Sequence, residues 1–428
     1  MMLKRLHLPM TITWFTVLFV LPMPFILLLS HGLPALYAPS AQYIMAGSIA
    51  YCWMLTAIYF STRPRWLDRL IGLPKIYMVH GILSLCAILV AFMHKTLMSS
   101  YGLIALTGNT AFYILAFLGV WSMVLMSGWL SSRFRILGDI RRTLERVFHH
   151  ELNVWLHRFN LVAVVLVFIH VNLISYITVI HPFMVLFDGA SALVAFAYLY
   201  EKLHQRYGAY RGEIETVQTL AFNTVEITMR VHGLHGKWEN GDFAFIRFPK
   251  MRGLHEYHPF SIVSLKDQTD IIRFAIRADG DFTRKLVSTA KAGMKARMIP
   301  PYGRYHHFIE EHAPNRPIVV FAGGIGVTPL VPVALSYGTH GRHMKFMYTA
   351  KSQDQLLYQE QLRQWSQASH CEAQLKVGRF SPEELKSAME QDALYLVAGP
   401  ASMLRSVRRM LLSQGVRAGD ICYEPFSW

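Results

Sequence analysis

Six long apolar runs in the first half of this sequence restrict its fold more than any other feature. They cover residues 11–30, 41–60, 76–97, 110–130, 154–177 and 183–201. Each is close to the roughly 20 residues that a helix needs to cross a hydrocarbon layer of ~30 Å. Because five more runs follow the first, we interpret the first as a membrane span and not as a cleaved signal peptide. The pattern predicts a membrane α-helical bundle of six spans that lies in a lipid bilayer.

Charge is distributed differently in the two halves of the chain. Residues 1–205 contain 14 Lys and Arg and only 6 Asp and Glu, whereas residues 206–428 contain 28 and 21. The first half is therefore poor in charge, while the second resembles an ordinary soluble protein. The net charge of +15 is shared almost equally between the halves, so no basic patch suggests a nucleic-acid partner.

Basic residues near the runs predict their orientation. Eleven Lys and Arg precede the first run or lie in the loops after the second and fourth runs, whereas only Lys95 lies at the opposite ends. Such an excess marks the cytoplasmic side. We expect a multi-pass protein of the cytoplasmic (inner) membrane, with both termini and everything after the sixth run in the cytoplasm.

Two of the six runs carry pairs of histidines. The third contains His80 and His94, and the fifth contains His157 and His170. Ionisable residues within spans are usually functional, and histidine is a common axial ligand of haem iron. A lone histidine would more often be structural, but two on each of two spans predict two bis-histidine haems. Given the orientation, His80 pairs with His157 near the cytoplasm, and His94 pairs with His170 near the outside.

The distance along the chain between the two histidines of one span differs between the third and the fifth span. The 14 residues from His80 to His94 rise about 21 Å with a net rotation of about −40°, so both face one side of a helix. The 13 residues from His157 to His170 give a rotation of about −140°. We therefore expect a tightened or bent turn in the fifth helix, or unequal haem orientations. Arg158 is interpreted either as a partner of a haem propionate or as an interfacial arginine that reaches water.

The pattern of the second half predicts two further folding units. From about residue 210, short β-branched and aromatic segments separated by Gly, Asn and Pro predict an antiparallel β-barrel. From about residue 316, a buried-strand pattern, a glycine-rich turn and a helical stretch begin an α/β alternation, which predicts an open parallel sheet with helices on both faces. The expected domains are residues 1–205, 206–313 and 314–428.

Three short motifs in these units point to nucleotide cofactors. The segment His258–Ser261 offers an aromatic ring and a hydroxyl that could meet a flavin ring. Arg277 and the helix start at residues 280–283 suit a pyrophosphate. The glycines of residues 323–326 follow a strand and open a helix, which allows a second pyrophosphate to approach the backbone.

In combination these features resemble the ferric reductase and NADPH oxidase superfamily of transmembrane flavohaem reductases. The resemblance covers the whole chain, through six spans, four spaced histidines and the motifs HPFS, GDFT, GGIGVTP and Gly399-Pro400 with an aromatic C-terminus. It implies a ferredoxin-reductase-like module after the spans, with FAD, two b-type haems and NADPH or NADH as cofactors.

The resemblance also implies roles for individual residues. The haem ligands would be His80, His94, His157 and His170. The FAD site would contain His258, Pro259, Phe260, Ser261, Arg277, Gly280 and Thr283. The nicotinamide nucleotide would meet Gly323, Gly324, Gly326, Thr328, Pro329, Gly399 and Pro400. Phe426 or Trp428 would shield the flavin ring, and Glu424 would lie near the hydride path. Lys351 either meets a 2′-phosphate, which would favour NADPH, or is a solvated surface lysine.

The expected function is electron transfer from cytoplasmic NAD(P)H through FAD and two haems to an acceptor on the outer side. The acceptor is O2, giving superoxide, or a ferric complex, and the motifs favour the oxidase slightly. One alternative is a haem-free, membrane-anchored flavin reductase. Another is a non-catalytic scaffold, supported only by Ala398, which stands where the family usually has Cys. The oligomeric state is left open.

Overall fold

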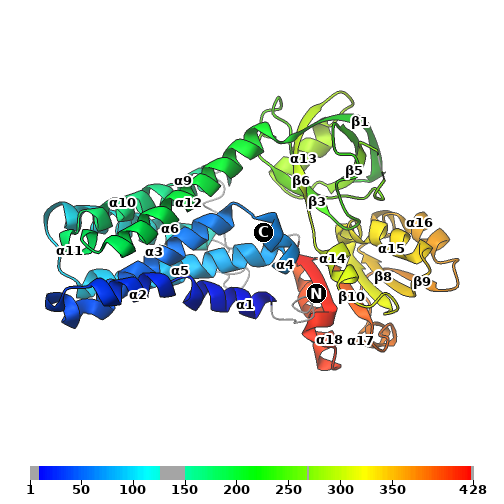
Figure 1. Cartoon of the computed structure of the whole chain (residues 1–428). Coiled ribbons are helices and arrows are strands. Elements are labelled where there is room, and N and C mark those ends of the chain that lie inside the picture. Colours follow the sequence, from blue (N-terminus) through cyan, green and yellow to red (C-terminus); the bar gives the residue numbers. More distant parts are fainter. Residues whose placement is uncertain (1–8, 126–149, 268, 426–428) are drawn as a thin grey trace. The chain divides into compact units, whose positions relative to one another are not determined.

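The computed structural model describes residues 9–125, 150–267 and 269–425. The chain divides into two compact units (Figure 1). Apart from the chain ends, one unit contains residues 8–67 and 75–203, and the other contains residues 68–74 and 204–427. Most of the loop arginines used to predict orientation, the end of the fourth predicted span, Phe426 and Trp428 lie outside the described residues.

The first unit consists of apolar helices. Six of those described are long and apolar enough to cross a membrane, which confirms the predicted bundle: Met10–Gly32, Ala35–Ser61, Leu73–Leu97, Gly102–Leu125, Asn153–Asn172 and His181–Gln205. The fourth begins at Gly102, eight residues earlier than expected, because Leu103, Ile104 and Leu106 extend its apolar run.

Three of these spans are regular over most of their length. They contain α5 (Leu73–Leu97), α6 (Gly102–Leu125) and α12 (His181–Tyr207). The second span begins as a 3₁₀ helix, Ala35–Ser40, and continues as α3 (Ala41–Ser61). A short helix, α4 (Arg65–Ile71), follows α3.

The first span contains a π-turn, Thr16–Val20, between α1 (Pro9–Phe15) and α2 (Met23–Gly32). Trp53 of α3 donates its indole N–H to the Val17 carbonyl of this turn at 3.1 Å. A π-turn disturbs the regular helical hydrogen bonding, and here a side chain of the neighbouring helix uses one of its carbonyls.

The fifth span has a tightened turn, which is one of the alternatives that the histidine spacing predicts. It is divided into α9 (His150–Arg158) and α10 (Asn160–Asn172), with the short α11 (Ser175–Thr178) after it. At the junction the amide of Phe159 bonds the carbonyl of Leu156 at 2.9 Å, and the amide of Val162 bonds the carbonyl of Phe159 at 3.0 Å. Both bonds span three residues, as in a 3₁₀ helix, so the chain is wound more tightly there than in an α-helix.

The second unit begins with a six-stranded antiparallel sheet in the order β4-β3-β6-β1-β2-β5. Its strands are β1 (Tyr210–Ala221), β2 (Thr224–Val231), β3 (Phe243–Arg247), β4 (His258–Ser261), β5 (Ile271–Arg277) and β6 (Lys295–Tyr302). An antiparallel bridge from Ile262 to Phe274 joins the two ends of this order and closes the predicted barrel. Helix α13 (Asp281–Thr289) follows β5, and α14 (Tyr305–Glu310) follows β6.

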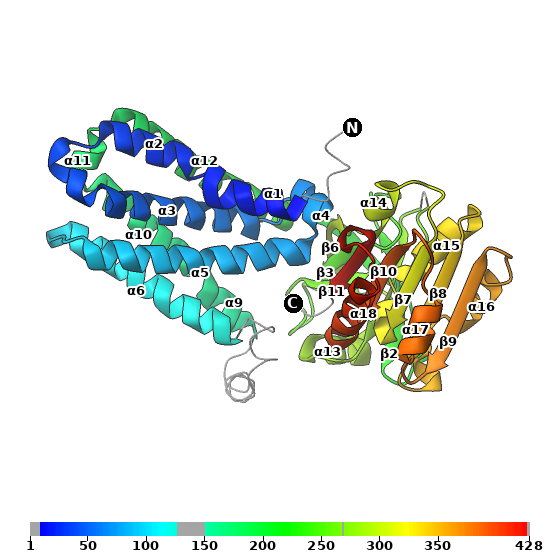
Figure 2. The same ribbon diagram turned by 90° about the horizontal axis from the view of Figure 1, so that it is seen from below.

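A five-stranded parallel sheet follows, in the order β11-β10-β7-β8-β9 (Figure 2). Its strands are β7 (Ile318–Gly323), β8 (Met344–Ala350), β9 (Cys371–Val377), β10 (Leu394–Gly399) and β11 (Ile421–Pro425). The helices between them are α15 (Leu330–Thr339), α16 (Gln359–Trp365), α17 (Pro382–Ser387) and α18 (Ala401–Ser413).

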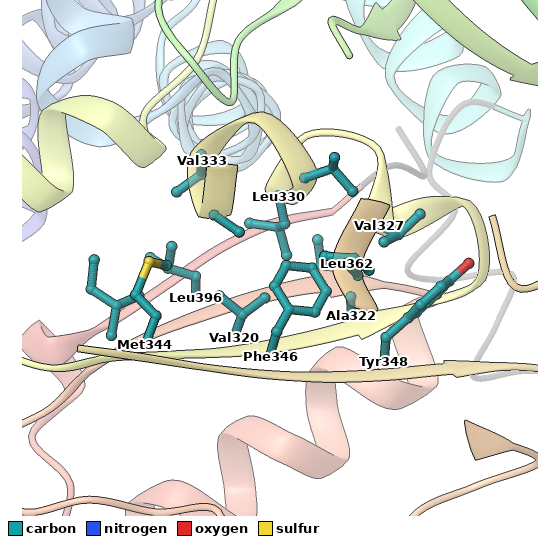
Figure 3. Close-up of a cluster of buried hydrophobic side chains, with 14 of the residues drawn as sticks. Val320, Ala322, Val327, Leu330, Val333, Met344, Phe346, Tyr348, Leu362 and Leu396 are labelled. Carbon is teal, nitrogen blue, oxygen red and sulfur yellow. The ribbon is translucent and has the colours of Figure 1, made fainter. Parts of the chain in front are cut away.

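Alternate residues of β7 face opposite sides of this sheet, as strand geometry requires. Val320 and Ala322 pack with Leu330 of α15 and Leu362 of α16 (Figure 3). Phe321 packs with side chains of α18 on the other face. Both faces are therefore covered by helices, as predicted, and the strands β7 and β10 are buried along their whole length.

Candidate functional site

The four span histidines form two facing pairs within the helical unit. The ring centroids of His80 and His157 lie 5.9 Å apart, and those of His94 and His170 lie 6.4 Å apart. A metal bonded to one nitrogen of each ring at about 2 Å would place the two centroids about 6 Å apart. Both pairs therefore have the separation that two axial ligands of one metal need.

Each ring is held through its Nδ1 atom, which leaves Nε2 as the nitrogen that could bind a metal. The Nδ1–H groups of three rings donate to backbone carbonyls at 2.8 Å: His80 to Ala57, His94 to Tyr43 and His170 to Ile104. The Nδ1 atom of His157 instead meets the Ser122 hydroxyl at 2.9 Å. A bond of this kind fixes the tautomer and orientation of a metal-ligating histidine.

The described residues contain no group of three or more His, Cys, Asp or Glu that could hold a metal ion. A pair of histidines therefore suits a metal that brings its other ligands with it, as haem iron does. Arg158 ends α9 directly after His157 and is exposed.

The flavin motif forms β4, which pairs with β3 at one end of the sheet order. The His258 ring stacks on Phe282 of α13, with centroids 3.8 Å apart and an interplanar angle of 29°. Pro259 is partly exposed, whereas Phe260 and Ser261 are buried. The motif thus presents one stacked imidazole next to the start of α13.

The start of α13 is organised by Thr283. Its Oγ1 atom accepts hydrogen bonds from the amides of Asp279 and Gly280, both at 2.9 Å. These two amides are therefore already used, and a pyrophosphate at this helix would need other hydrogen-bond donors. The guanidinium of Arg277 supplies such donors. Its Nη2 atom lies 3.1 Å from the exposed Asp279 carboxylate, and its Nη1 atom lies 3.4 Å from where a Cβ of Gly324 would stand. Arg277 therefore connects the expected FAD site with the nucleotide loop.

Two glycines of the nucleotide loop are required by its backbone. Gly324 has φ +55°, in the left-handed region that favours glycine. A Cβ on Gly326 would lie 2.6 Å from backbone atoms of Ala398 and Gly399. The loop continues through Thr328, whose hydroxyl caps the Ile325 carbonyl at 2.8 Å, and Pro329 then precedes α15.

The loop lies at the point where the strand order of the parallel sheet reverses. From β7 the chain proceeds through β8 and β9 on one side and then through β10 and β11 on the other. Ligands of such sheets bind outside the carboxyl ends of the strands at this switch point. The structure brings together there the residues expected to meet the nicotinamide nucleotide, Gly323–Gly326 after β7 and Gly399-Pro400 after β10. Lys351 is exposed directly after the neighbouring β8.

Glu424 lies on β11 beside Ala398 of β10 and is buried. Its Oε1 atom accepts the amide N–H of Arg304 at 2.9 Å. Burial raises the pKa of Glu424 to about 8, and the carboxylates of Asp68 and Asp242 add to the rise. The carboxyl group is therefore largely protonated at neutral pH.

Two further buried carboxylates meet the turn after β6, at Gly303, and no sequence motif indicated them. Asp68 accepts the Gly303 amide at 3.4 Å and the Leu73 amide at 2.7 Å, and burial raises its pKa to about 6. Asp242 lies against Gly303, and burial raises its pKa well above the usual value. No local motif could have found this group, because Asp68 and Gly303 are 235 residues apart.

Comparisons with known proteins support the flavin part of the site. Residues 209–323 match the FAD-binding domain family. The flavohemoprotein of Schizosaccharomyces pombe is 26% identical over 188 residues, which cover 38% of this chain and 44% of that protein. A probable dihydroorotate dehydrogenase B electron transfer subunit from Methanocaldococcus jannaschii is 25% identical over 171 residues, which cover 39% of this chain and 60% of that subunit.

These matches fit the ferric reductase and NADPH oxidase superfamily. They support a flavin-dependent oxidoreductase. Flavohemoprotein A of Dictyostelium discoideum is a further relative, 23% identical over 158 residues that cover 35% of this chain and 39% of that protein. The chain thus spans less than half the length of the two flavohemoproteins that it matches.

One solved structure is similar over most of the chain. The flavohemoglobin of Malassezia yamatoensis, with bound FAD and heme, covers 92% of this chain and 100% of its own, at 16% identity and a TM-score of 0.48.

Proposed function

We propose that this protein is a multi-pass enzyme of the cytoplasmic membrane that moves electrons from cytoplasmic NAD(P)H to an acceptor on the outer side. Its cofactors are FAD and two bis-histidine b-type haems. The preferred acceptor is O2, which would give superoxide, and a ferric complex is the second candidate. The domains would be residues 1–205 for the haems, 206–313 for FAD and 314–428 for the nucleotide.

One observation carries the proposal more than any other. Two histidine pairs lie within helices long enough to span a membrane, with ring centroids 5.9 and 6.4 Å apart, and each Nδ1 atom has a hydrogen-bonding partner. A buried histidine that served packing alone would have no need of a second ring facing it at this distance. The repetition of the arrangement favours two metal centres.

In this proposal the residues of the second unit bind FAD and the nicotinamide nucleotide, which supply the electrons. When bound, FAD would accept a hydride from the nicotinamide and release single electrons, which haem iron can carry. Gly324 and Gly326 let the backbone approach the dinucleotide, and Arg277 offers a guanidinium to a phosphate. Burial raises the pKa of Glu424 to about 8, which favours the uncharged carboxyl beside Ala398, near the expected hydride path.

The histidines also constrain the reaction at the outer side. Because His94 and His170 would both hold one haem iron, that iron would supply electron transfer and would not bind O2 itself. The acceptor must then meet the edge of the outer site. That requirement suits both O2 and a ferric complex, and it leaves the choice to experiment.

The deciding experiment is NADPH-driven reduction of cytochrome c by the purified full-length protein with added FAD, with and without superoxide dismutase. Loss of the signal with dismutase indicates that electrons leave as superoxide. A signal that survives dismutase favours a ferric or other direct acceptor. A protein that reduces cytochrome c but has no Soret band is instead the haem-free flavin reductase, and the proposed function is then wrong.

A further inference from the structure

Two glycines of the helical unit have a histidine ring directly in front of them. A Cβ on Gly47 of α3 would lie 2.9 Å from Cε1 and Nδ1 of His94. A Cβ on Gly108 of α6 would lie 2.9 Å from the same two atoms of His170. Real Cβ atoms essentially never come this close, so any other residue would have to displace the ring.

Each of these glycines also lies four residues after the backbone carbonyl that accepts the hydrogen bond of the ring. His94 donates to the carbonyl of Tyr43, four residues before Gly47. His170 donates to the carbonyl of Ile104, four residues before Gly108. In an α-helix that carbonyl already accepts the amide of the residue four positions later, which here is the glycine.

This relation gives a physical reason for glycine at both positions. At Gly47 and Gly108 a Cβ would stand against the Nδ1 atom of the ring, which is the atom that donates to the carbonyl, and would obstruct the approach of the ring. Without it, the imidazole can lie against the helix backbone and reach the oxygen at 2.8 Å. Glycine inside a helix is destabilising relative to alanine, so two in this role need a local benefit.

The arrangement is confined to one of the two pairs. Among the glycines that the structure describes, only Gly47 and Gly108 have one of the four paired rings as the nearest neighbour of the missing Cβ. In the other pair, His157 bonds the side chain of Ser122 in place of a backbone carbonyl. His80 of that pair does donate to a helix carbonyl, that of Ala57, but Ser61 and not glycine stands four residues later. Only the His94–His170 pair therefore combines the carbonyl bond with a glycine.

We propose that Gly47 and Gly108 are positioning residues of the outer haem site, which set the orientation of His94 and His170 by exposing a helix carbonyl to each ring. This inference rests on the proposed ligation of haem by these histidines. A side chain at either glycine would rotate or displace the ring, weaken its bond to the carbonyl and misdirect Nε2. The outer site alone should be affected.

The test is the pair of variants Gly47→Ala and Gly108→Ala, purified as full-length protein and assayed for haem b by pyridine haemochrome and for midpoint potentials by redox titration. Matched controls are Gly81→Ala of α5 and Gly189→Ala of α12, since a Cβ at either position meets no atom within 4 Å. We expect the haem content of each test variant to fall from about two per chain towards one, or one midpoint potential to shift. The controls should retain both haems and both potentials.

A double-mutant cycle separates this role from general helix packing. We expect Gly47→Ala to lower the unfolding temperature in the wild-type background and to have little effect in a His94→Ala background, where the ring is absent. An equal loss in both backgrounds would overturn the positioning role, as would two unchanged haems in both glycine variants. If the wild type itself binds no haem, the proposed function and this inference fail together. If it binds two and the glycine variants match the controls, only this inference fails.

Discussion

The backbone amide of Arg304 donates a hydrogen bond of 2.9 Å to Oε1 of Glu424, which ties β11 to the turn after β6. Asp68 and Asp242 meet the same turn at Gly303. Burial of three carboxyl groups at one place makes the charged form of each costly. Their protonation should therefore be linked to folding of this unit.

Replacement of Glu424 by Gln should flatten the dependence of stability on pH. The folded pKa of about 8 lies above the usual 4.5, so the folded state binds a proton that the unfolded state has lost. The stability from this group is therefore fully present below about pH 4.5 and is lost as pH rises to about 8. Thermal release of FAD from the full-length protein between pH 5 and 8 measures the effect.

The temperature at which the wild type releases FAD should fall as the pH rises from 5 to 8. The release temperature of the Glu424→Gln variant should fall less. Asp68 and Asp242 keep part of the slope in the variant. Glu360→Gln, at an exposed position of α16, is the matched control and should behave as the wild type. Equal slopes in all three proteins would show that Glu424 is charged in the folded state.

Gly326→Ala should slow reduction of the flavin by NADPH by about tenfold to a hundredfold, since small displacements in a reacting geometry cost rates of this size. The new Cβ would meet the backbone of Ala398 and Gly399 at 2.6 Å and push the loop away from β10. Stopped-flow flavin reduction checks this. FAD content and the dithionite-reduced haem spectrum should not change. A wild-type rate would contradict the assignment of the nicotinamide to this switch point.

Arg277→Gln should weaken FAD binding by about tenfold, the size expected for the loss of one hydrogen bond to a charged group. Titration of flavin-depleted full-length protein with FAD, followed by flavin fluorescence, gives the dissociation constant. Arg230→Gln is a suitable control, because Arg230 is an exposed arginine on β2 that pairs with Glu215. A similar small change in both variants would argue against phosphate binding by Arg277.

Lys351→Gln tests the preference between the two nicotinamide nucleotides. If Lys351 meets a 2′-phosphate, kcat/KM for NADPH should fall by about tenfold while the value for NADH stays constant. Steady-state kinetics with both donors provides the comparison, and Lys386→Gln at an exposed position of α17 is the control. An unchanged ratio of the two values would identify Lys351 as a solvated surface lysine.

Periodic features of the sequence were sufficient to predict most of this fold. The lengths of the apolar runs predicted six spans. The rotation between His157 and His170 predicted a tightened or bent turn or unequal haem orientations, and the structure has a tightened turn at Phe159. The glycine-rich segment after a buried strand predicted the position of the nucleotide loop at β7. Each of these signals lies within one short stretch of the chain, where residue spacing translates directly into geometry.

Features that depend on distant contacts could not be predicted in this way. Asp68 joins Gly303 across 235 residues, and nothing near either residue indicates the other. The role of Thr283 was also unexpected, because its hydroxyl bonds the amide of Gly280, at the helix start that was expected to meet a phosphate. Gly47 and Gly108 resemble ordinary small residues of apolar helices until the histidine rings in front of them are known.

The most direct test of the account is the haem content of the purified protein and of its His94→Leu and His170→Leu variants. We predict two low-spin b-type haems per FAD in the wild type, measured by pyridine haemochrome and electron paramagnetic resonance. Each variant should retain one haem, with unchanged FAD content and unchanged reduction of the flavin by NADPH. Absence of a Soret band in the wild type, or two retained haems in both variants, would contradict the account.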